Sequence, residues 1–264
     1  MKRALALLAA PLSVAAAFFF APLALMAYRS VIDRDGVLSL DHYSRFVTDP
    51  YYVGGLAITL VTALVVTAIA LACSYPVAYA YWRASGRLKS VLVVLLLSPF
   101  YANVVVKVFG WMVLLPADWL NGYTGLLIVS VHRAMPFMVL LVASAMSRIE
   151  PEWLESARMC GASSVRVVRT IVWPLSIPGV VAGSVLVFSI TVAAYVVPAI
   201  VGGTWRGRFL PVLMYQQMTI AQDWGFGAAI GMILLFASLV TIAIGNRVVL
   251  RSRAGIMMRE GFDA

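Results

Sequence analysis

Six long apolar stretches divide this chain, and they constrain its fold more than any other feature. A helix of about 20 apolar residues is long enough to cross the hydrocarbon core of a bilayer. An open strand would leave backbone groups unsatisfied in lipid, so each stretch is predicted to be a helix. We therefore expect an all-α membrane protein with six transmembrane helices, forming a single transmembrane domain over residues 1–264. The predicted spans are Ala4–Tyr28, Val53–Trp82, Leu88–Leu115, Thr124–Met146, Trp173–Val201 and Phe226–Leu250.

The composition supports the membrane assignment. Hydrophobic residues make up 62% of the chain, charged residues 12%, and the mean hydropathy is +0.95. Soluble domains typically carry about 25% charged residues, so a soluble core of this size would leave apolar surface in water. Six spans in 264 residues leave only short connections. The sequence therefore excludes a separate soluble catalytic domain.

The first stretch follows Met1-Lys2-Arg3, and Ala15-Ala16-Ala17 resembles a signal-peptide cleavage site. The apolar run continues to Tyr28, however, well past the roughly 7–15 apolar residues of a signal peptide. We predict an uncleaved first transmembrane helix.

The basic residues predict the orientation of the helices. With the N-terminus inside, thirteen Lys and Arg residues fall in cytoplasmic segments, six fall outside, and Lys107 lies within the third span. Arg133 is the doubtful member of the outer six, because it falls within the fourth span. Cytoplasmic loops carry the excess of Lys and Arg, so both termini are predicted to be cytoplasmic. The net charge of +9 is then a sign of topology, and nucleic acid is not expected as a partner.

The cytoplasmic loop of about 148–172, between the fourth and fifth spans, has a local pattern of its own. Pro151 suits the first position of a helix, and Gly161 suits the left-handed residue that ends one. Ser163 or Ser164 would cap a second helix. The pattern predicts a projecting helix–glycine–helix element, and the small residues around the glycine would let a partner approach closely. The alternative is a tightly folded loop that binds nothing.

The spacing in this loop resembles a known family. The permease subunits of binding-protein-dependent ABC importers carry Glu-Ala-Ala, three residues, Gly, nine residues, Ile, one residue and Leu-Pro. This chain has Glu155-Ser156-Ala157, then Gly161, Ile171 and Trp173-Pro174 at the same spacing, with Ser156 and Trp173 departing from the pattern. Ser98-Pro99-Phe100, Gly202-Gly203 and Gln216-Gln217 resemble the spermidine/putrescine-type branch.

The resemblance implies an ABC type I importer permease fold in the bacterial inner membrane. The loop would be the coupling helix, which docks on an ATP-binding subunit. Two such subunits would bind ATP and Mg, a second permease would be a different chain, and an external substrate-binding protein would deliver a polyamine or another small organic solute. The implied docking residues are Glu155, Ser156, Ala157, Gly161 and Ala162.

No enzyme motif accompanies this pattern. The sequence has no Gly-x-x-x-x-Gly-Lys-Ser/Thr, His-Glu-x-x-His or Gly-x-Ser-x-Gly. Its two histidines, His42 and His132, are far apart, and Cys73 and Cys160 form no metal-binding pair. We expect a chain without catalytic activity, metal or cofactor, with ATP hydrolysis in a separate subunit.

Polar residues within the spans are candidates for a translocation pathway. Lys107 is an intramembrane charge, which marks a functional candidate. Lys107 would repel a polyamine locally, hold a gate shut or attract an anion. The structural alternative is that its side chain snorkels to the membrane interface. Arg133 is open to the same interpretations. Tyr101, Asn103 and Tyr195 are further candidates, although hydrogen bonds between helices explain such residues too.

A secondary transporter or channel subunit without ATPase coupling is the alternative function. Such a protein would favour acidic residues in the spans or an evident internal repeat. All acidic residues of this chain lie outside the predicted spans. A membrane scaffold would explain the composition but leave the glutamate–glycine–proline spacing to chance.

Overall fold

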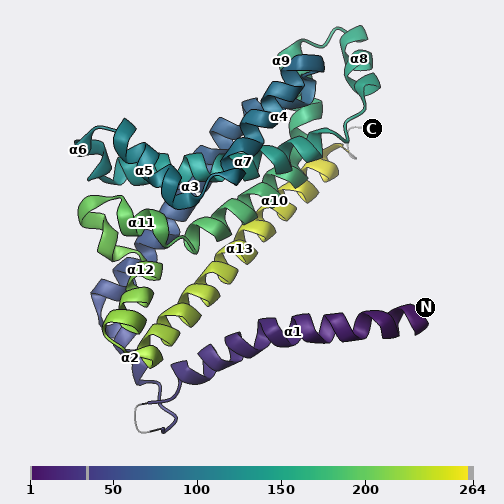
Figure 1. Ribbon diagram of the computed structural model, residues 1–264. Coiled ribbons are helices and arrows are strands. Elements are labelled where there is room, and N and C mark those ends of the chain that lie inside the picture. The colour runs from purple at the N-terminus through teal and green to yellow at the C-terminus, as the bar shows by residue number, and fades with distance from the viewer. Residues whose placement is uncertain (1, 34–35, 261–264) are drawn as a thin grey trace. The chain divides into compact units, whose positions relative to one another are not determined.

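The computed structural model describes residues 2–33 and 36–260, with side chains over most of residues 14–247. Within that part of the chain the regular structure is helical, apart from one antiparallel bridge between Ile32 and Leu38 (Figure 1). Large apolar side chains such as Val113 and Phe18 are exposed, as expected where lipid is the solvent. The prediction of an all-helical membrane protein is confirmed.

Four helical segments in the described residues are long and apolar enough to cross a membrane. They are α3 (Pro50–Arg83), α7 (Tyr123–Met146), the run Ser164–Ile200 containing α10 (Trp173–Val192) and α11 (Val196–Ile200), and Trp224–Arg247 of α13 (Trp224–Glu260). The first predicted span lies on α1 (Lys2–Ser30), of which the described apolar part, Ala16–Ser30, is too short to cross. The rest of that span lies outside the residues whose side chains are described.

The third predicted span differs from a continuous helix. Helices α4 (Gly86–Tyr101) and α5 (Val104–Leu114) meet at an angle of 105°. Ala102 is extended, and Asn103 starts α5 as its N-cap, with its side-chain oxygen accepting a hydrogen bond from the Val105 amide at 2.8 Å. A cap that satisfies a free amide stabilises a new helix start. Helices α4 and α5 form a fifth membrane span only if the bent pair is one transmembrane segment.

The chain forms two compact units, and α3 and α13 contribute to both. The larger comprises Ile58–Gly207 and Ser238–Ala264. Its core joins α3 and α7 to the loop after α7, and includes Val66, Met138 and Met146 without exposure. Hydrogen bonds from α3 reach α7 through Thr62 and Tyr123 (2.8 Å) and α10 through Tyr75 and Ser176 (3.0 Å).

Helices α7 and α10 pack closely because two glycines lie at their contact. A Cβ at Gly179 would meet the Leu141 carbonyl oxygen at 2.5 Å, and one at Gly183 would meet the Met138 sulfur at 2.6 Å. Two glycines separated by three residues are a known way to bring membrane helices together.

The smaller unit comprises Met1–Ala57 and Arg208–Ala237. It contains α2 (Asp41–Thr48), α12 (Leu210–Tyr215), the π-helix η3 (Gln216–Ile220) and the beginnings of α3 and α13. Phe226 is fully buried there, with its ring 4.8 Å from that of Tyr52. A Cβ at Gly55 would meet the Arg208 carbonyl oxygen at 2.8 Å, so α3 approaches the segment before α12 closely.

Candidate functional site

The helix–glycine–helix element predicted from the sequence is present as two short helices. Helix α8 (Pro151–Met159) begins with its proline in the first turn, and α9 (Ser164–Val167) follows with Ser163 as its N-cap. The Ser163 side chain accepts a hydrogen bond from the Arg166 amide at 3.4 Å. A π-helix, η1 (Val168–Val172), then leads directly into α10. We call residues 151–167 the knob.

A glycine in the left-handed region makes the turn between the two helices. Gly161 has φ of +80°, which a residue with a Cβ adopts at a cost. Its amide donates to the Arg158 carbonyl at 2.9 Å, and the Ala162 amide donates to the Ala157 carbonyl at 3.0 Å. These two bonds form a Schellman motif, which satisfies the carbonyls at the end of α8. The helix–glycine–helix geometry predicted from the sequence is therefore what the structure shows.

Buried side chains tie the knob to the core of the larger unit. Leu154 and Val167, one on each short helix, are 5% and 3% exposed and belong to the core that contains Met146. Ala157 and Ala162 pack against the same core. The two helices are therefore held as one rigid element on the ends of α7 and α10.

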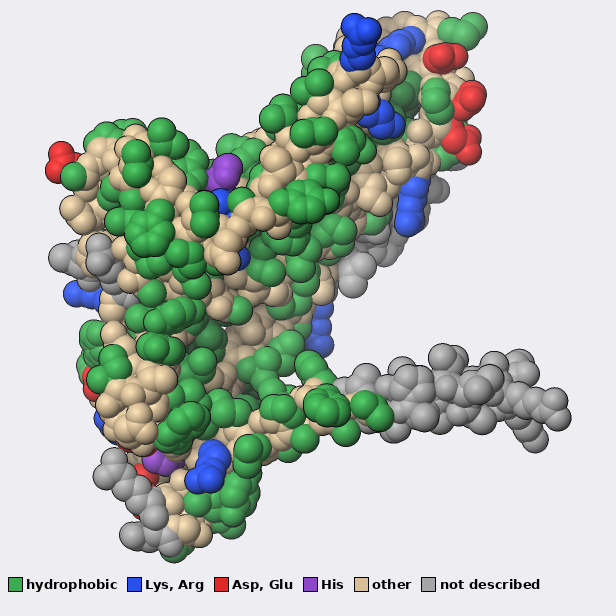
Figure 2. Space-filling view, viewed as in Figure 1, with side chains coloured by type: hydrophobic (Ala, Val, Ile, Leu, Met, Phe, Trp, Pro, Cys, Tyr) green, Lys and Arg blue, Asp and Glu red, His purple; other side chains and the backbone are tan. Residues whose placement is uncertain are grey.

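The outer side of the knob remains open. Met159 is 89% exposed and Val165 is 78% exposed, while Glu155, Ser156 and Gly161 are also exposed. A Cβ built on Gly161 would meet nothing within 4 Å beyond the glycine and its two chain neighbours. Figure 2 shows acidic and basic side chains gathered at the end of the molecule where Figure 1 places α8 and α9. Such a surface, apolar at its tip and charged around it, has the composition of a protein-binding surface.

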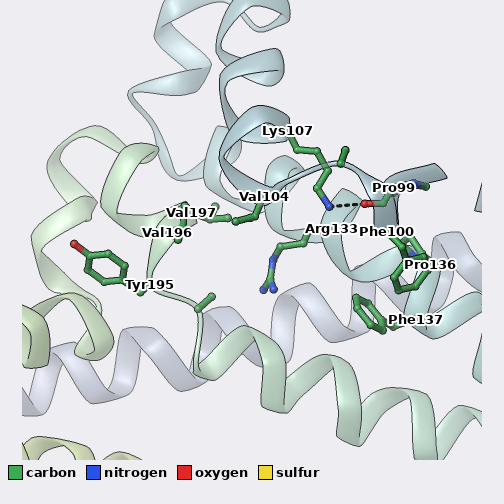
Figure 3. Close-up of a pocket in the computed structure, with 12 residues that line it drawn as sticks. Pro99, Phe100, Val104, Lys107, Arg133, Pro136, Phe137, Tyr195, Val196 and Val197 are labelled. Carbon is green, nitrogen blue, oxygen red and sulfur yellow. Dashed lines mark hydrogen bonds between the residues drawn. The ribbon is translucent and has the colours of Figure 1, made fainter. Parts of the chain in front are cut away.

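A cavity of about 340 Å³ lies where the helices of the larger unit are broken. It lies beside the α4–α5 bend and the segment that joins α10 to α11 (Figure 3). Its lining residues are Pro99, Phe100, Ala102, Val104, Lys107, Arg133, Pro136, Phe137, Ala194, Tyr195, Val196 and Val197. Two of these twelve are cationic and none is acidic.

The Lys107 ammonium bonds to the end of the helix before the bend. Its Nζ donates to the Pro99 carbonyl at 2.9 Å (Figure 3). Pro99 lies in the last turn of α4, where carbonyls lack intrahelical partners and the helix dipole is negative. Lys107 therefore stabilises the bend from the cavity side.

Arg133 makes the equivalent contact at the end of α10. Its Nη2 donates to the Ile190 carbonyl at 3.1 Å, in the last turn of that helix. Its Nε is buried without a hydrogen-bond partner. Each of the two broken helix ends thus receives a cation from a neighbouring helix.

The structure separates the four predicted pathway residues. Lys107 and Tyr195 line the cavity, and the Tyr195 hydroxyl points away from Lys107 and Arg133 (Figure 3). Tyr101 is 88% exposed and Asn103 caps α5, and neither is among the lining residues. Arg133, which the sequence left open to the same interpretations as Lys107, also lines the cavity.

Comparison with known proteins identifies the class of molecule that this fold and knob define. The model of the family described as "Binding-protein-dependent transport system inner membrane component" matches residues 65–254. The chain belongs to this family. It is a multi-pass inner-membrane permease subunit of an ABC importer and is not itself catalytic. The ATPase is a separate component of the complex, which also includes a binding protein. Permeases of this family typically lack cofactors.

Particular relatives cover nearly the whole chain. The spermidine/putrescine transport system permease protein PotB of Salmonella typhi is 28% identical over 92% of this chain and 90% of its own length. The protein of the same name from Haemophilus influenzae is 25% identical over 85% and 87%. A putative 2-aminoethylphosphonate transport system permease protein, PhnU of Salmonella choleraesuis, is 25% identical over 87% and 86%.

Solved structures share the fold at lower identity. A chain of a bacterial ABC transporter involved in the import of the acidic polysaccharide alginate aligns with a TM-score of 0.73 and 14% identity, over 94% of this chain and 96% of its own. A chain of the MetNI methionine ABC transporter, in an inward-facing conformation, aligns with a TM-score of 0.64 and 18% identity, over 76% and 95%. The expected ABC importer permease fold is confirmed by these likenesses.

Proposed function

We propose that this chain crosses the inner membrane six times with both termini in the cytoplasm. We further propose that it forms half of a solute pathway, with a second and different permease chain as the other half. Two ATP-binding subunits power the transport, and an external binding protein delivers the solute. The solute is a small organic molecule; the names of the relatives make polyamines and a phosphonate the first candidates.

The observation that carries this proposal is the shape of the knob. Its helices are fixed to the ends of α7 and α10 through Leu154 and Val167, while its tip is exposed. A rigid element of this kind transmits a movement of its partner to the helices behind it. Glu155, Ser156, Ala157, Gly161 and Ala162 are the residues that we propose dock on the ATPase, with Gly161 making the turn.

Two substitutions of Gly161 test the docking. Gly161→Val places a branched side chain at φ of +80°, so the turn is strained and the knob deforms. Gly161→Asn is the matched control for backbone strain, because asparagine tolerates the left-handed region. We expect the valine variant to insert in the membrane but to lose co-purification with the ATPase. The asparagine variant separates backbone strain at the turn from a steric clash with the ATPase. If it still docks, the loss in the valine variant comes from the strained turn; if it does not dock, the loss comes from the new side chain at the contact with the ATPase.

The readouts are co-purification of the ATPase and solute uptake by the assembled importer. Full uptake and normal co-purification in the Gly161→Val variant would contradict the assignment of the knob as the coupling element. Uptake of labelled spermidine and of 2-aminoethylphosphonate by the wild-type importer then distinguishes the two candidate solutes.

A further inference from the structure

The cavity beside the two broken helix ends has an unbalanced charge. Lys107 and Arg133 both line it, and both donate hydrogen bonds to neutral backbone carbonyls. No residue in its described lining is acidic, and the sequence places no acidic residue in any of the six predicted spans. Among the described residues that line it, the positive charge of this surface therefore has no carboxylate beside it.

The helix ends offset only part of this charge. The C-terminal end of a helix carries roughly half a negative elementary charge. The ends of α4 and α10 together therefore offset about one of the two positive charges, and only within their last turns. A low-dielectric wall makes the remaining charge felt more strongly than in water. The cavity is therefore positively charged even after the negative helix ends are counted.

Hydrogen-bonding capacity remains as well as charge. An ammonium has three donors and a guanidinium has five, while Lys107 and Arg133 each make a side-chain bond to one carbonyl. The buried Arg133 Nε has no partner. A smaller neighbouring cavity, lined by Lys107, His132, Arg133 and Trp111, adds an imidazole and no carboxylate to the same region. Oxygens of an anionic group would satisfy donors of this kind.

We propose that the solute conducted past this chain carries an oxyanion group, such as a phosphonate, phosphate or carboxylate, which Lys107 and Arg133 attract into the cavity. This inference rests on the proposed permease function and narrows its solute class. Clefts lined by one sign of charge concentrate the oppositely charged ligand and repel a like-charged one. A polyamine, with several positive charges, would meet repulsion from this half of the pathway.

Cysteine modification measures the charge of the cavity directly. Ala194→Cys places a thiol in the lining, in a background where the exposed Cys73 and Cys160 are both replaced by serine. Membranes containing the importer are treated with two methanethiosulfonates of similar size, one with a sulfonate and one with a trimethylammonium group. Ser184→Cys is the control, because it lines a second cavity of about 160 Å³ that contains no charged residue.

The quantity compared is the rate of modification by the anionic reagent divided by the rate with the cationic reagent. We expect this ratio to be about tenfold higher at Ala194→Cys than at Ser184→Cys. Lys107→Met should lower this ratio, and Lys107→Arg, which keeps the charge, should preserve it. Methylphosphonate should slow the modification of Ala194→Cys, whereas spermidine should not. A cationic preference, protection by spermidine, no protection by methylphosphonate, or no reaction with either reagent would each overturn the proposal.

Co-purification of the ATPase is recorded on the same membranes. If the ATPase does not co-purify, the proposed function is contradicted. The ratio of anionic to cationic modification rates still tests the charge of the cavity in that case. The two failures are therefore distinguishable.

Discussion

Arg45 and Asp223 are 178 residues apart in sequence, and their side chains form an ion pair at 3.2 Å within the smaller unit. The Arg45 guanidinium also lies 4.0 Å from the centre of the Phe226 ring. Asp223 has a second role, because its Oδ1 accepts a hydrogen bond from the Phe226 amide at 3.1 Å at the start of α13. One carboxylate thus caps a helix and holds α2 against it.

The two roles of Asp223 can be separated by substitution. Arg45→Met removes the ion pair and the cation–ring contact; since Arg45 is 50% exposed, we expect a loss of at most about 1 kcal/mol. Asp223→Ala also removes the cap, which is typically worth about 1 kcal/mol more. Asp223→Ser keeps a capping oxygen and should resemble Arg45→Met. Thermal unfolding in detergent ranks the stabilities of the three variants. Equal effects of Asp223→Ala and Asp223→Ser would contradict the capping role.

The two glycines between α7 and α10 should differ in their tolerance of alanine. A Cβ at Gly179 would meet backbone, the Leu141 carbonyl oxygen at 2.5 Å and Val142 Cα at 3.0 Å, which cannot move alone. At Gly183 the near atom is the sulfur of Met138, on a flexible side chain. We expect Gly179→Ala to lower stability by about 1–3 kcal/mol and Gly183→Ala by less. Unfolding temperatures of the two variants compare them, and a larger effect at Gly183 would show that the Met138 side chain is the more rigid neighbour.

The bend between α4 and α5 should depend on the cap at Asn103. Asn103→Ala leaves the Val105 amide without its acceptor and should cost about 0.5–2 kcal/mol, whereas Asn103→Ser or Asn103→Asp should restore most of the loss. Uptake by the importer and unfolding temperature should follow the same order if the bend shapes the cavity. If alanine and serine behave alike in both measurements, the cap does not hold the bend.

The native Cys160 reports the orientation of the knob. It is exposed beside Gly161, and both termini are proposed to be cytoplasmic, so Cys160 should be open to the cytoplasm alone. In a Cys73→Ser background, a membrane-impermeant maleimide should label inside-out vesicles and leave intact spheroplasts unlabelled. A Cys160→Ser variant is the control for non-specific labelling. Labelling of intact spheroplasts would reverse the proposed topology.

The knob could be predicted from the sequence because its determinants are local. Pro151 sets a helix start, Gly161 supplies a backbone conformation that other residues avoid, and Ser163 caps the next helix, all within thirteen residues. The length of the apolar stretches likewise determined the helical class, and the distribution of arginine and lysine set the expected topology. None of these inferences needs a contact between distant parts of the chain.

Tertiary structure decided how the spans are used. Whether the third span is straight depended on the Asn103 cap and on Lys107 reaching back to the Pro99 carbonyl across the bend. The sequence marked Arg133 as an intramembrane charge, but only the tertiary structure placed it beside the end of α10, where it donates to the Ile190 carbonyl. Sequence fixes which residues must avoid water, but helices in lipid choose their partners through close packing and polar contacts between segments far apart in the chain. The six apolar stretches therefore predicted a membrane protein, and the breaks within them created its cationic cavity.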